Sequence, residues 1–227
     1  MDKEAVCAKI REIGIVPAVR TTSAEEARFA AEVIAKSGIP IVEITMTVPG
    51  AMDVISYLTK NLPDVIIGAG TLLDLETTRL CVDAGVQFLT SPSLDREIVE
   101  FATKENLTML AGALTPTEVI TAWKTGSDFV KVFPCAQVGG DSYIRALRGP
   151  FPRVPLIAAG GVNQQTAGNF ILAGADALGI GRELIPKEAL QHRQEGRIRE
   201  LARRFLNFVK IARSHKSNGD SLPRLSP

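Results

Sequence analysis

The sequence contains few of the residues that mark several common classes of protein. It has three cysteines in 227 residues, an odd number at wide spacing that fits neither a disulfide framework nor a zinc site. The 26 lysines and arginines nearly balance the 25 aspartates and glutamates, so the net charge gives no case for a nucleic-acid partner. Only 5% of the residues are aromatic, and the core must therefore be built from aliphatic side chains, as in α/β proteins.

Histidine and long apolar segments are also scarce. The two histidines, His192 and His215, both lie in the C-terminal part, so acid–base chemistry elsewhere must use carboxylates, lysine or water. No apolar run approaches the roughly 20 residues that span a bilayer, and the charged start, Met1-Asp2-Lys3-Glu4, lacks the apolar run of a signal peptide. We therefore expect a soluble cytoplasmic protein without a membrane or nucleic-acid partner.

Short apolar runs alternate with amphipathic stretches along almost the whole chain. The runs predict eight buried strands, at 15–19, 41–45, 65–69, 87–90, 107–111, 128–134, 155–158 and 176–180. Helices are predicted around them, at 3–13, 23–36, 49–60, 74–84, 95–105, 115–124, 141–147, 163–173 and 194–213. Strict alternation implies right-handed crossovers and a parallel sheet.

Eight such units predict an α/β fold of the (β/α)8 TIM-barrel type. It would form a single domain over residues 1–213, with an extra N-terminal helix and a long C-terminal helix whose basic face is solvated. The alternative, an open doubly wound sheet, would carry a glycine-rich loop after its first strand, and Val19-Arg20-Thr21-Thr22 has no glycine. The polar residues 214–227 are expected to form a disordered tail.

A lysine interrupts one of the apolar strands, Asp128-Phe129-Val130-Lys131-Val132-Phe133-Pro134. Burial disfavours the charged form of such a lysine, so it needs a partner, a route to solvent or a chemical role. A neutral buried amine can attack a carbonyl and form a Schiff base. Alternatively, its stem lies along apolar surface while the ammonium group reaches water.

A carboxylate is equally unusual in the second strand, where Glu43 lies among Ile41, Val42 and Ile44. Alternate residues of a barrel strand point inward, and active sites lie at the C-terminal ends of the strands. Glu43 and Lys131 pointing inward would combine a Schiff-base lysine with a general acid–base. The alternative is a buried ion pair that only fixes the register of the strands.

Polar groups and glycines follow several other strands. Arg20 ends the first strand, and Thr71 follows the third in Gly68-Ala69-Gly70-Thr71. Gly160-Gly161 and Gly181-Arg182 follow the last two strands, where barrels commonly bind phosphate through free backbone N–H groups. Tight turns would give the same glycines without a ligand.

Five motifs together resemble the 2-keto-3-deoxy-6-phosphogluconate (KDPG) and 4-hydroxy-2-oxoglutarate aldolase family. In chain order they are Val42-Glu43-Ile44-Thr45, Gly68-Ala69-Gly70-Thr71, Ser91-Pro92, Lys131-Val132-Phe133-Pro134 and Gly160-Gly161-Val162. The similarity runs from about residue 10 to 190. It implies a metal-free class I aldolase without a cofactor, on a (β/α)8 barrel, that assembles as a homotrimer and splits a keto-deoxy sugar acid into pyruvate and an aldehyde.

The resemblance also implies roles for single residues. Lys131 would form the Schiff base, Glu43 would be the general acid–base and Thr71 would contact the pyruvate moiety. The remaining substrate-binding residues that it implies are Arg20, Thr47, Phe133, Gly160, Gly161, Gly181 and Arg182. Among these, Gly160, Gly161 and Gly181 match the phosphate end of the substrate site.

This chain departs from the family pattern at three positions. Thr47 stands where many members have an arginine for the pyruvate carboxylate, and Arg20 is the candidate replacement. Ala159 stands where many members have a threonine, and Arg182 replaces a serine at the phosphate. An arginine fork can bind either phosphate or carboxylate. The anion site is therefore either kept, or retuned to an unphosphorylated or dicarboxylate substrate.

The expected reaction is cleavage of KDPG to pyruvate and glyceraldehyde 3-phosphate, the aldol step of the Entner–Doudoroff route. The alternatives are an aldolase for 4-hydroxy-2-oxoglutarate or an unphosphorylated keto-deoxy acid, a phosphate-binding barrel isomerase or synthase without covalent catalysis, and a non-catalytic sugar-acid binder. Cys135, just after Pro134, is interpreted as a packing residue and not as a nucleophile.

Overall fold

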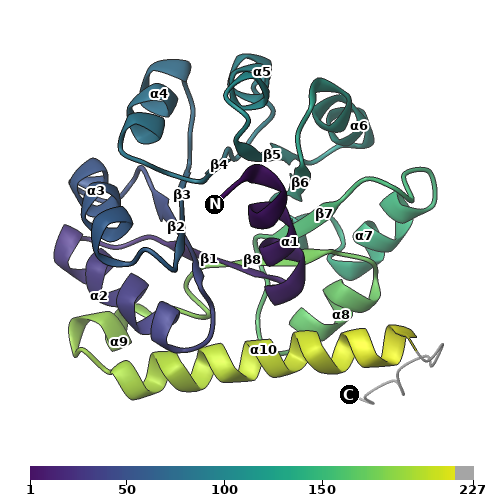
Figure 1. The fold of residues 1–227 in the computed structure, drawn as a ribbon. Coiled ribbons are helices and arrows are strands. Elements are labelled where there is room, and N and C mark those ends of the chain that lie inside the picture. The colour runs from purple at the N-terminus through teal and green to yellow at the C-terminus, as the bar shows by residue number, and fades with distance from the viewer. Residues whose placement is uncertain (218–227) are drawn as a thin grey trace.

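The computed structural model describes residues 1–217 and contains eight parallel strands that close into a barrel in chain order (Figure 1). The strands are β1 (Ile15–Val19), β2 (Ile41–Thr45), β3 (Ile66–Gly70), β4 (Phe88–Thr90), β5 (Thr108–Ala113), β6 (Phe129–Val132), β7 (Leu156–Ala159) and β8 (Ala177–Ile180). The predicted TIM-barrel fold is therefore confirmed, with every predicted strand present.

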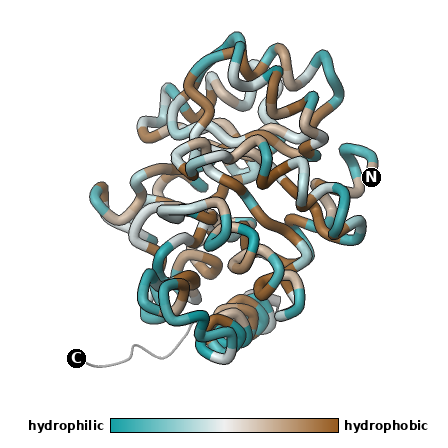
Figure 2. The backbone as a smooth tube through the Cα atoms, turned by 90° about the vertical axis from the view of Figure 1, so that its left-hand side faces the viewer, coloured by the Kyte–Doolittle hydropathy of each residue, from teal (hydrophilic) through white to brown (hydrophobic). Residues whose placement is uncertain are grey.

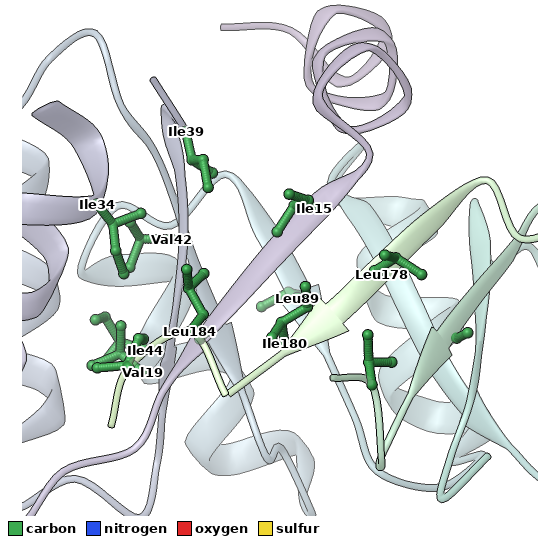
Figure 3. Packing of buried hydrophobic residues seen from close by; sticks show 14 of the residues in the cluster. Ile15, Val19, Ile34, Ile39, Val42, Ile44, Leu89, Leu178, Ile180 and Leu184 are labelled. Atoms are coloured by element: carbon green, nitrogen blue, oxygen red, sulfur yellow. The ribbon is translucent and has the colours of Figure 1, made fainter. Parts of the chain in front are cut away.

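Helices surround the barrel and follow each strand. They are α1 (Lys3–Ile13), α2 (Ala24–Lys36), α3 (Ala51–Asn61), α4 (Leu75–Asp83), α5 (Arg96–Lys104), α6 (Pro116–Thr125), the 3-10 turn η1 (Ala136–Val138), α7 (Asp141–Arg148), α8 (Ala167–Leu172), α9 (Lys187–Gln191) and α10 (Glu195–Ser217). Outward-facing aliphatic residues of the strands pack on these helices, as Figure 3 shows for Ile34 of α2 against Val42 of β2.

Two predicted helix boundaries were wrong, and two short elements were missed. The helix predicted from Asn163 begins only at Ala167, because the Asn163 side chain accepts hydrogen bonds from the N–H groups of Gln165 and Thr166 (2.9 and 3.0 Å) and holds a turn. Helix α10 continues past residue 213 to Ser217. The rest of the predicted tail, 218–227, lies outside the described residues. Neither α9 nor η1 was predicted.

Apolar side chains fill the half of the barrel at the N-terminal ends of the strands, and α1 covers this end (Figure 1). The strand residues of this inner cluster all point inward and pack beneath Val6, Cys7 and Ile10 of α1. They are Val16, Ile41, Ile66, Phe88, Leu110, Phe129, Ile157 and Ala177. This end of the barrel is therefore a closed core, and any site must lie at the other end.

The strand register determines which residues share the next interior layers. A barrel layer takes one inward-facing side chain from every second strand. Because the strands are tilted, the layer continues on every second strand at the residue two positions after the paired one. The pairings that show this are Glu43↔Gly68↔Phe88, Thr90↔Leu110↔Phe129 and Lys131↔Ile157↔Ala177. The layer above the apolar core is accordingly Glu43, Thr90, Lys131 and Gly179, and the layer above that is Ala18, Gly70, Gly112 and Ala159. The side chains thus become small just above the two charged residues.

Helix α10 is the longest helix and lies across the outside of the barrel against α2, α8 and α9 (Figure 1). Its hydropathy alternates around the helix, with an apolar side toward the barrel (Figure 2). That side contains Ile198, Ala202, Phe205, Val209 and Ala212, all buried. No helix in residues 1–217 is long and apolar enough to cross a membrane.

Candidate active site

Lys131 of β6 and Glu43 of β2 face each other inside the C-terminal half of the barrel. The Lys131 Nζ lies 3.9 Å from Glu43 Oε2, and the two side chains are 14% and 4% exposed. The strands adjacent to them present almost no other polar side chain at this level. The structure therefore brings together the two predicted charged residues as an isolated pair within ion-pair distance.

Glycines in the neighbouring strands make room for this pair. A Cβ on Gly70 would lie 2.0 Å from Glu43 Oε1, so the carboxylate occupies the place of the missing side chain on β3. A Cβ on Gly112 would lie 2.2 Å from the carbonyl carbon of Pro92, so the loop after β4 closes that side of the barrel. The interior remains open on the opposite side, toward β6, β7, β8 and β1.

A cavity of about 530 Å³ fills this open side. Eight of the predicted site residues line it: Arg20, Glu43, Lys131, Phe133, Gly160, Gly161, Gly181 and Arg182. The ring of Phe133 stands 5.7 Å from Lys131 Nζ, within the range of a cation–π contact. The volume fits a small metabolite of the usual pocket size.

Two predicted substrate-binding residues do not line this cavity. Thr47 is exposed, and its hydroxyl lies 2.8 Å from the hydroxyl of Thr45. Thr71 has a φ of 61°, a conformation that is rare for a β-branched residue. The roles of Thr47 and Thr71 stay predictions.

Backbone N–H groups and cations gather at the end of the cavity formed by β7 and β8. Gly160 and Gly161 have φ values of 80° and 88°, which turn the chain sharply after β7. Within the described residues, the N–H groups of Gly161 and Gly181 have no hydrogen-bond acceptor. Arg182 and Lys187 line the same end. This arrangement favours an anionic group of the ligand.

The outer part of the cavity contains residues that the sequence analysis did not assign to the site. Thr22 lies in the segment between β1 and α2, and Glu26 lies in the first turn of α2. Glu183 follows β8, and Lys187 is the first residue of α9. Glu26 Oε2 accepts hydrogen bonds from the N–H and the hydroxyl of Thr22 (3.1 and 2.9 Å). In the sequence, Glu26 stands three residues after Ser23 in a helix-capping pattern, and nothing local indicates that this helix start faces a cavity.

The three cysteines are buried and none lines the cavity. Burial, with a smaller contribution from Asp141, raises the pKa of Cys135 to about 11. Its thiol therefore stays protonated at neutral pH and donates to the carbonyl of Gly140 (3.5 Å), in agreement with a packing role. Within residues 1–217, no group of three His, Cys, Asp or Glu side chains is arranged to hold a metal ion.

Comparison with known proteins identifies the family. The family model of KDPG and KHG aldolases matches residues 6–201. The chain belongs to this aldolase family. The KHG/KDPG aldolase of Escherichia coli is 30% identical over 87% of this chain and 92% of its own length. The 2-dehydro-3-deoxy-phosphogluconate aldolase of Haemophilus influenzae is 28% identical over 91% of this chain and 98% of its own. The protein is therefore an aldolase, a lyase.

Solved structures agree with this assignment. The KDPG aldolase of Legionella pneumophila, with pyruvate captured at low pH as a covalent carbinolamine intermediate, superposes on this aldolase with a TM-score of 0.79. It is 28% identical and covers 86% of this chain and 95% of its own. A native KDPGal structure gives a TM-score of 0.81 at 26% identity, covering 88% of this chain and 96% of its own.

Proposed function

We propose that this protein is a class I aldolase that cleaves a 2-keto-3-deoxy sugar acid to pyruvate and an aldehyde through a Schiff base on Lys131. The observation that carries the proposal is the isolated pair of Lys131 and Glu43, 3.9 Å apart at the inner end of the cavity. A buried amine beside a buried carboxylate is what imine chemistry needs, because one group bonds to carbon while the other moves protons.

The first half of the reaction forms the imine. The neutral amine of Lys131 adds to the C2 carbonyl carbon of the substrate, and the carbonyl oxygen takes up a proton to give a carbinolamine. Loss of water leaves a protonated imine, whose positive nitrogen attracts electrons from the C3–C4 bond. The pyruvate captured as a carbinolamine in the Legionella aldolase supports the same first step here.

The second half breaks the carbon–carbon bond. Glu43, directly or through a water, takes the proton of the C4 hydroxyl. The C4–O bond becomes a carbonyl, and the electrons of the C3–C4 bond form an enamine with the imine nitrogen. The aldehyde leaves, Glu43 returns its proton to C3, and water hydrolyses the resulting imine to pyruvate and free Lys131.

The two ends of the cavity suggest how the substrate is oriented. Arg20 would bind the pyruvate carboxylate, while the N–H groups of Gly161 and Gly181 and the Arg182 side chain would bind the anion at the far end. We propose KDPG as the substrate, with glyceraldehyde 3-phosphate as the aldehyde. A second candidate is 4-hydroxy-2-oxoglutarate, because the Arg182 guanidinium binds carboxylate as well as phosphate.

Borohydride trapping tests the covalent step. Incubation with pyruvate and sodium borohydride should add one pyruvate-sized mass, and peptide mapping should place it on Lys131. Lys131→Met should abolish both the adduct and cleavage, whereas Lys124→Met, at an exposed position of α6, should retain both. An active enzyme that forms no adduct, or one modified at another lysine, would remove the Schiff-base assignment.

Steady-state kinetics with two substrates separates the candidates. We expect kcat/KM to be higher for KDPG than for 4-hydroxy-2-oxoglutarate, and Arg182→Ser to lower it about tenfold for the substrate whose distal anion it binds. A higher kcat/KM for the dicarboxylate would assign the second substrate. The predicted homotrimer is checked separately by sedimentation equilibrium.

A further inference from the structure

Thr90 of β4 has a buried hydroxyl without a partner. Within residues 1–217, its Oγ1 is one of two buried side-chain atoms that make no hydrogen bond. The other, Arg28 Nε, belongs to a partly exposed side chain stacked 4.6 Å from the Tyr57 ring. Thr90 is fully buried at 0% exposure. Valine would fill the same space without the polar group, so the hydroxyl needs a physical explanation.

The strand register places Thr90 in the same interior layer as Glu43. Phe88 belongs to the inner cluster and Leu89 to the outer one, so Thr90 points into the barrel. It shares the interior layer with Glu43 and Lys131. The pairing of Gly68 with Phe88 and of Ala69 with Leu89 puts Thr90 next to Gly70, whose side-chain position is taken by Glu43 Oε1.

Glu43 lacks the partner that Thr90 can provide. No described side chain or N–H group donates a hydrogen bond to its carboxylate, and the 3.9 Å to Lys131 Nζ is longer than a hydrogen bond. The carboxylate must accept a proton and return it during the proposed reaction. A hydroxyl suits both states, because it donates to a carboxylate and accepts from a carboxylic acid.

We propose that Thr90 is a positioning residue whose hydroxyl hydrogen-bonds the Glu43 side chain through one bridging water, since the two side chains make no direct hydrogen bond in this structure. The inference rests on the proposed function, in which Glu43 moves the protons. Thr90 does not line the cavity, so it acts on the substrate only through Glu43. The charged group that faces Glu43 is Lys131 on β6, and Arg20, after β1, lines the same cavity. Strands β3 and β4 present Gly68, Gly70 and Phe88 at their other inward positions.

Thr90→Val, compared with Thr90→Ser, tests this role by its pH profile. The valine variant loses the donor to the ionised carboxylate, so the acidic limb of kcat should move about one unit toward higher pH. We expect kcat near neutral pH to fall about tenfold while KM changes little. The serine variant keeps the hydroxyl and should restore the wild-type profile.

A purely structural hydroxyl gives a different result. In that case Thr90→Val would raise the melting temperature and leave kcat, KM and the pH profile unchanged, which overturns the inference. Equal profiles for the valine and serine variants would overturn it as well. If the valine variant does not fold, Thr90→Ala takes its place with the same expected shift.

Borohydride trapping on the wild type separates the failure of the proposed function from the failure of the Thr90 role. If no adduct forms, the proposed function fails. If an adduct forms and the pH profile of the valine variant does not move, only the role of Thr90 fails.

Discussion

Small residues leave open space above the pair of Lys131 and Glu43. The interior layer above Glu43 and Lys131 consists of Ala18, Gly70, Gly112 and Ala159, so no large side chain of this layer fills the space above the pair. At two of these positions, other groups occupy the space that a side chain would fill. The Glu43 carboxylate takes the place of a side chain at Gly70, and the Pro92 carbonyl does so at Gly112. The absence of side chains here is as necessary to the site as the two charges.

Gly70→Ala should therefore impair catalysis much more than folding. The new Cβ would lie 2.0 Å from Glu43 Oε1 and must displace the carboxylate from its present position. We expect kcat to fall about 100-fold, the lower end of the usual contribution of a general acid–base. The adduct with pyruvate should still form on Lys131, because the lysine itself is not displaced.

Gly168→Ala is the matched control for this substitution. Nothing lies within 4 Å of a Cβ at Gly168, which is in α8, so alanine should stabilise the helix by up to about 1 kcal/mol without loss of activity. Full activity of Gly70→Ala would show that Glu43 works from another position than the one in this structure. Steady-state rates and thermal unfolding of both variants provide the comparison.

Site residues can be predicted from the sequence where a charged residue stands in an otherwise apolar strand. Lys131 and Glu43 stand out because charges are rare in buried strands, and that anomaly is visible without coordinates. Thr90 does not stand out, since threonine is an ordinary strand residue, and only the register shows that it shares an interior layer with Glu43. Glu26 and Lys187 reach the cavity from the first turns of α2 and α9, and no local pattern specifies that these helix ends face the cavity.

Helix α6 illustrates how a local signal gives a reliable helix start. Thr115 Oγ1 accepts from the Glu118 N–H (3.3 Å), and Glu118 Oε2 accepts from the N–H groups of Thr115 and Leu114 (2.7 and 2.9 Å). This capping box satisfies backbone donors that the helix leaves free, and Pro116 follows where no N–H is needed. The hydrogen bonds from Thr115 and then Leu114 lower the pKa of Glu118.

The capping box should make the stability of the protein depend on acid pH. Because the pKa of Glu118 is lower in the folded than in the unfolded chain, its contribution is present above the unfolded pKa and is lost as the pH falls through the folded pKa. In Glu118→Gln, unfolding in urea should therefore vary less between pH 3 and pH 6 than in the wild type, roughly the range around a glutamate pKa. An identical pH dependence in the two proteins would contradict this role.

Helix N-termini that have a side-chain cap are easier to predict from the sequence than short helices are. Strong caps at Ser23, Asp74, Asp95 and Thr115 coincide with the predicted starts of four helices. Asn163 gives the same signal, but its side chain holds a separate turn before α8. Helix α9 has only five residues and no side-chain cap, so it leaves no periodic pattern in the sequence.

One arginine connects α1, which precedes the barrel strands in the chain, with α10, which follows them. Arg213 of α10 donates to the carbonyls of Glu12 and Arg11 at the C-terminal end of α1 (2.7 and 2.6 Å) and to that of Asp176 before β8 (3.0 Å). Gly14, with a φ of 71°, ends α1 without a side chain, and a Cβ there would lie 2.5 Å from the guanidinium. Arg213 thus joins α10, α1 and the barrel, and it satisfies carbonyls that a helix end leaves unpaired.

Arg213→Lys should therefore destabilise the fold without changing catalysis. A lysine carries one ammonium group and cannot reproduce the fork that contacts three carbonyls, so we expect a loss of about 2 kcal/mol in the free energy of unfolding. The site at the opposite end of the barrel should keep its kcat and KM at temperatures where the variant is folded.

Arg203→Lys, at an exposed position of the same helix, is the control and should change the free energy of unfolding by less than about 0.5 kcal/mol. If urea unfolding gave equal midpoints for the two variants, the contacts of Arg213 would not be what holds α10 and α1 to the barrel.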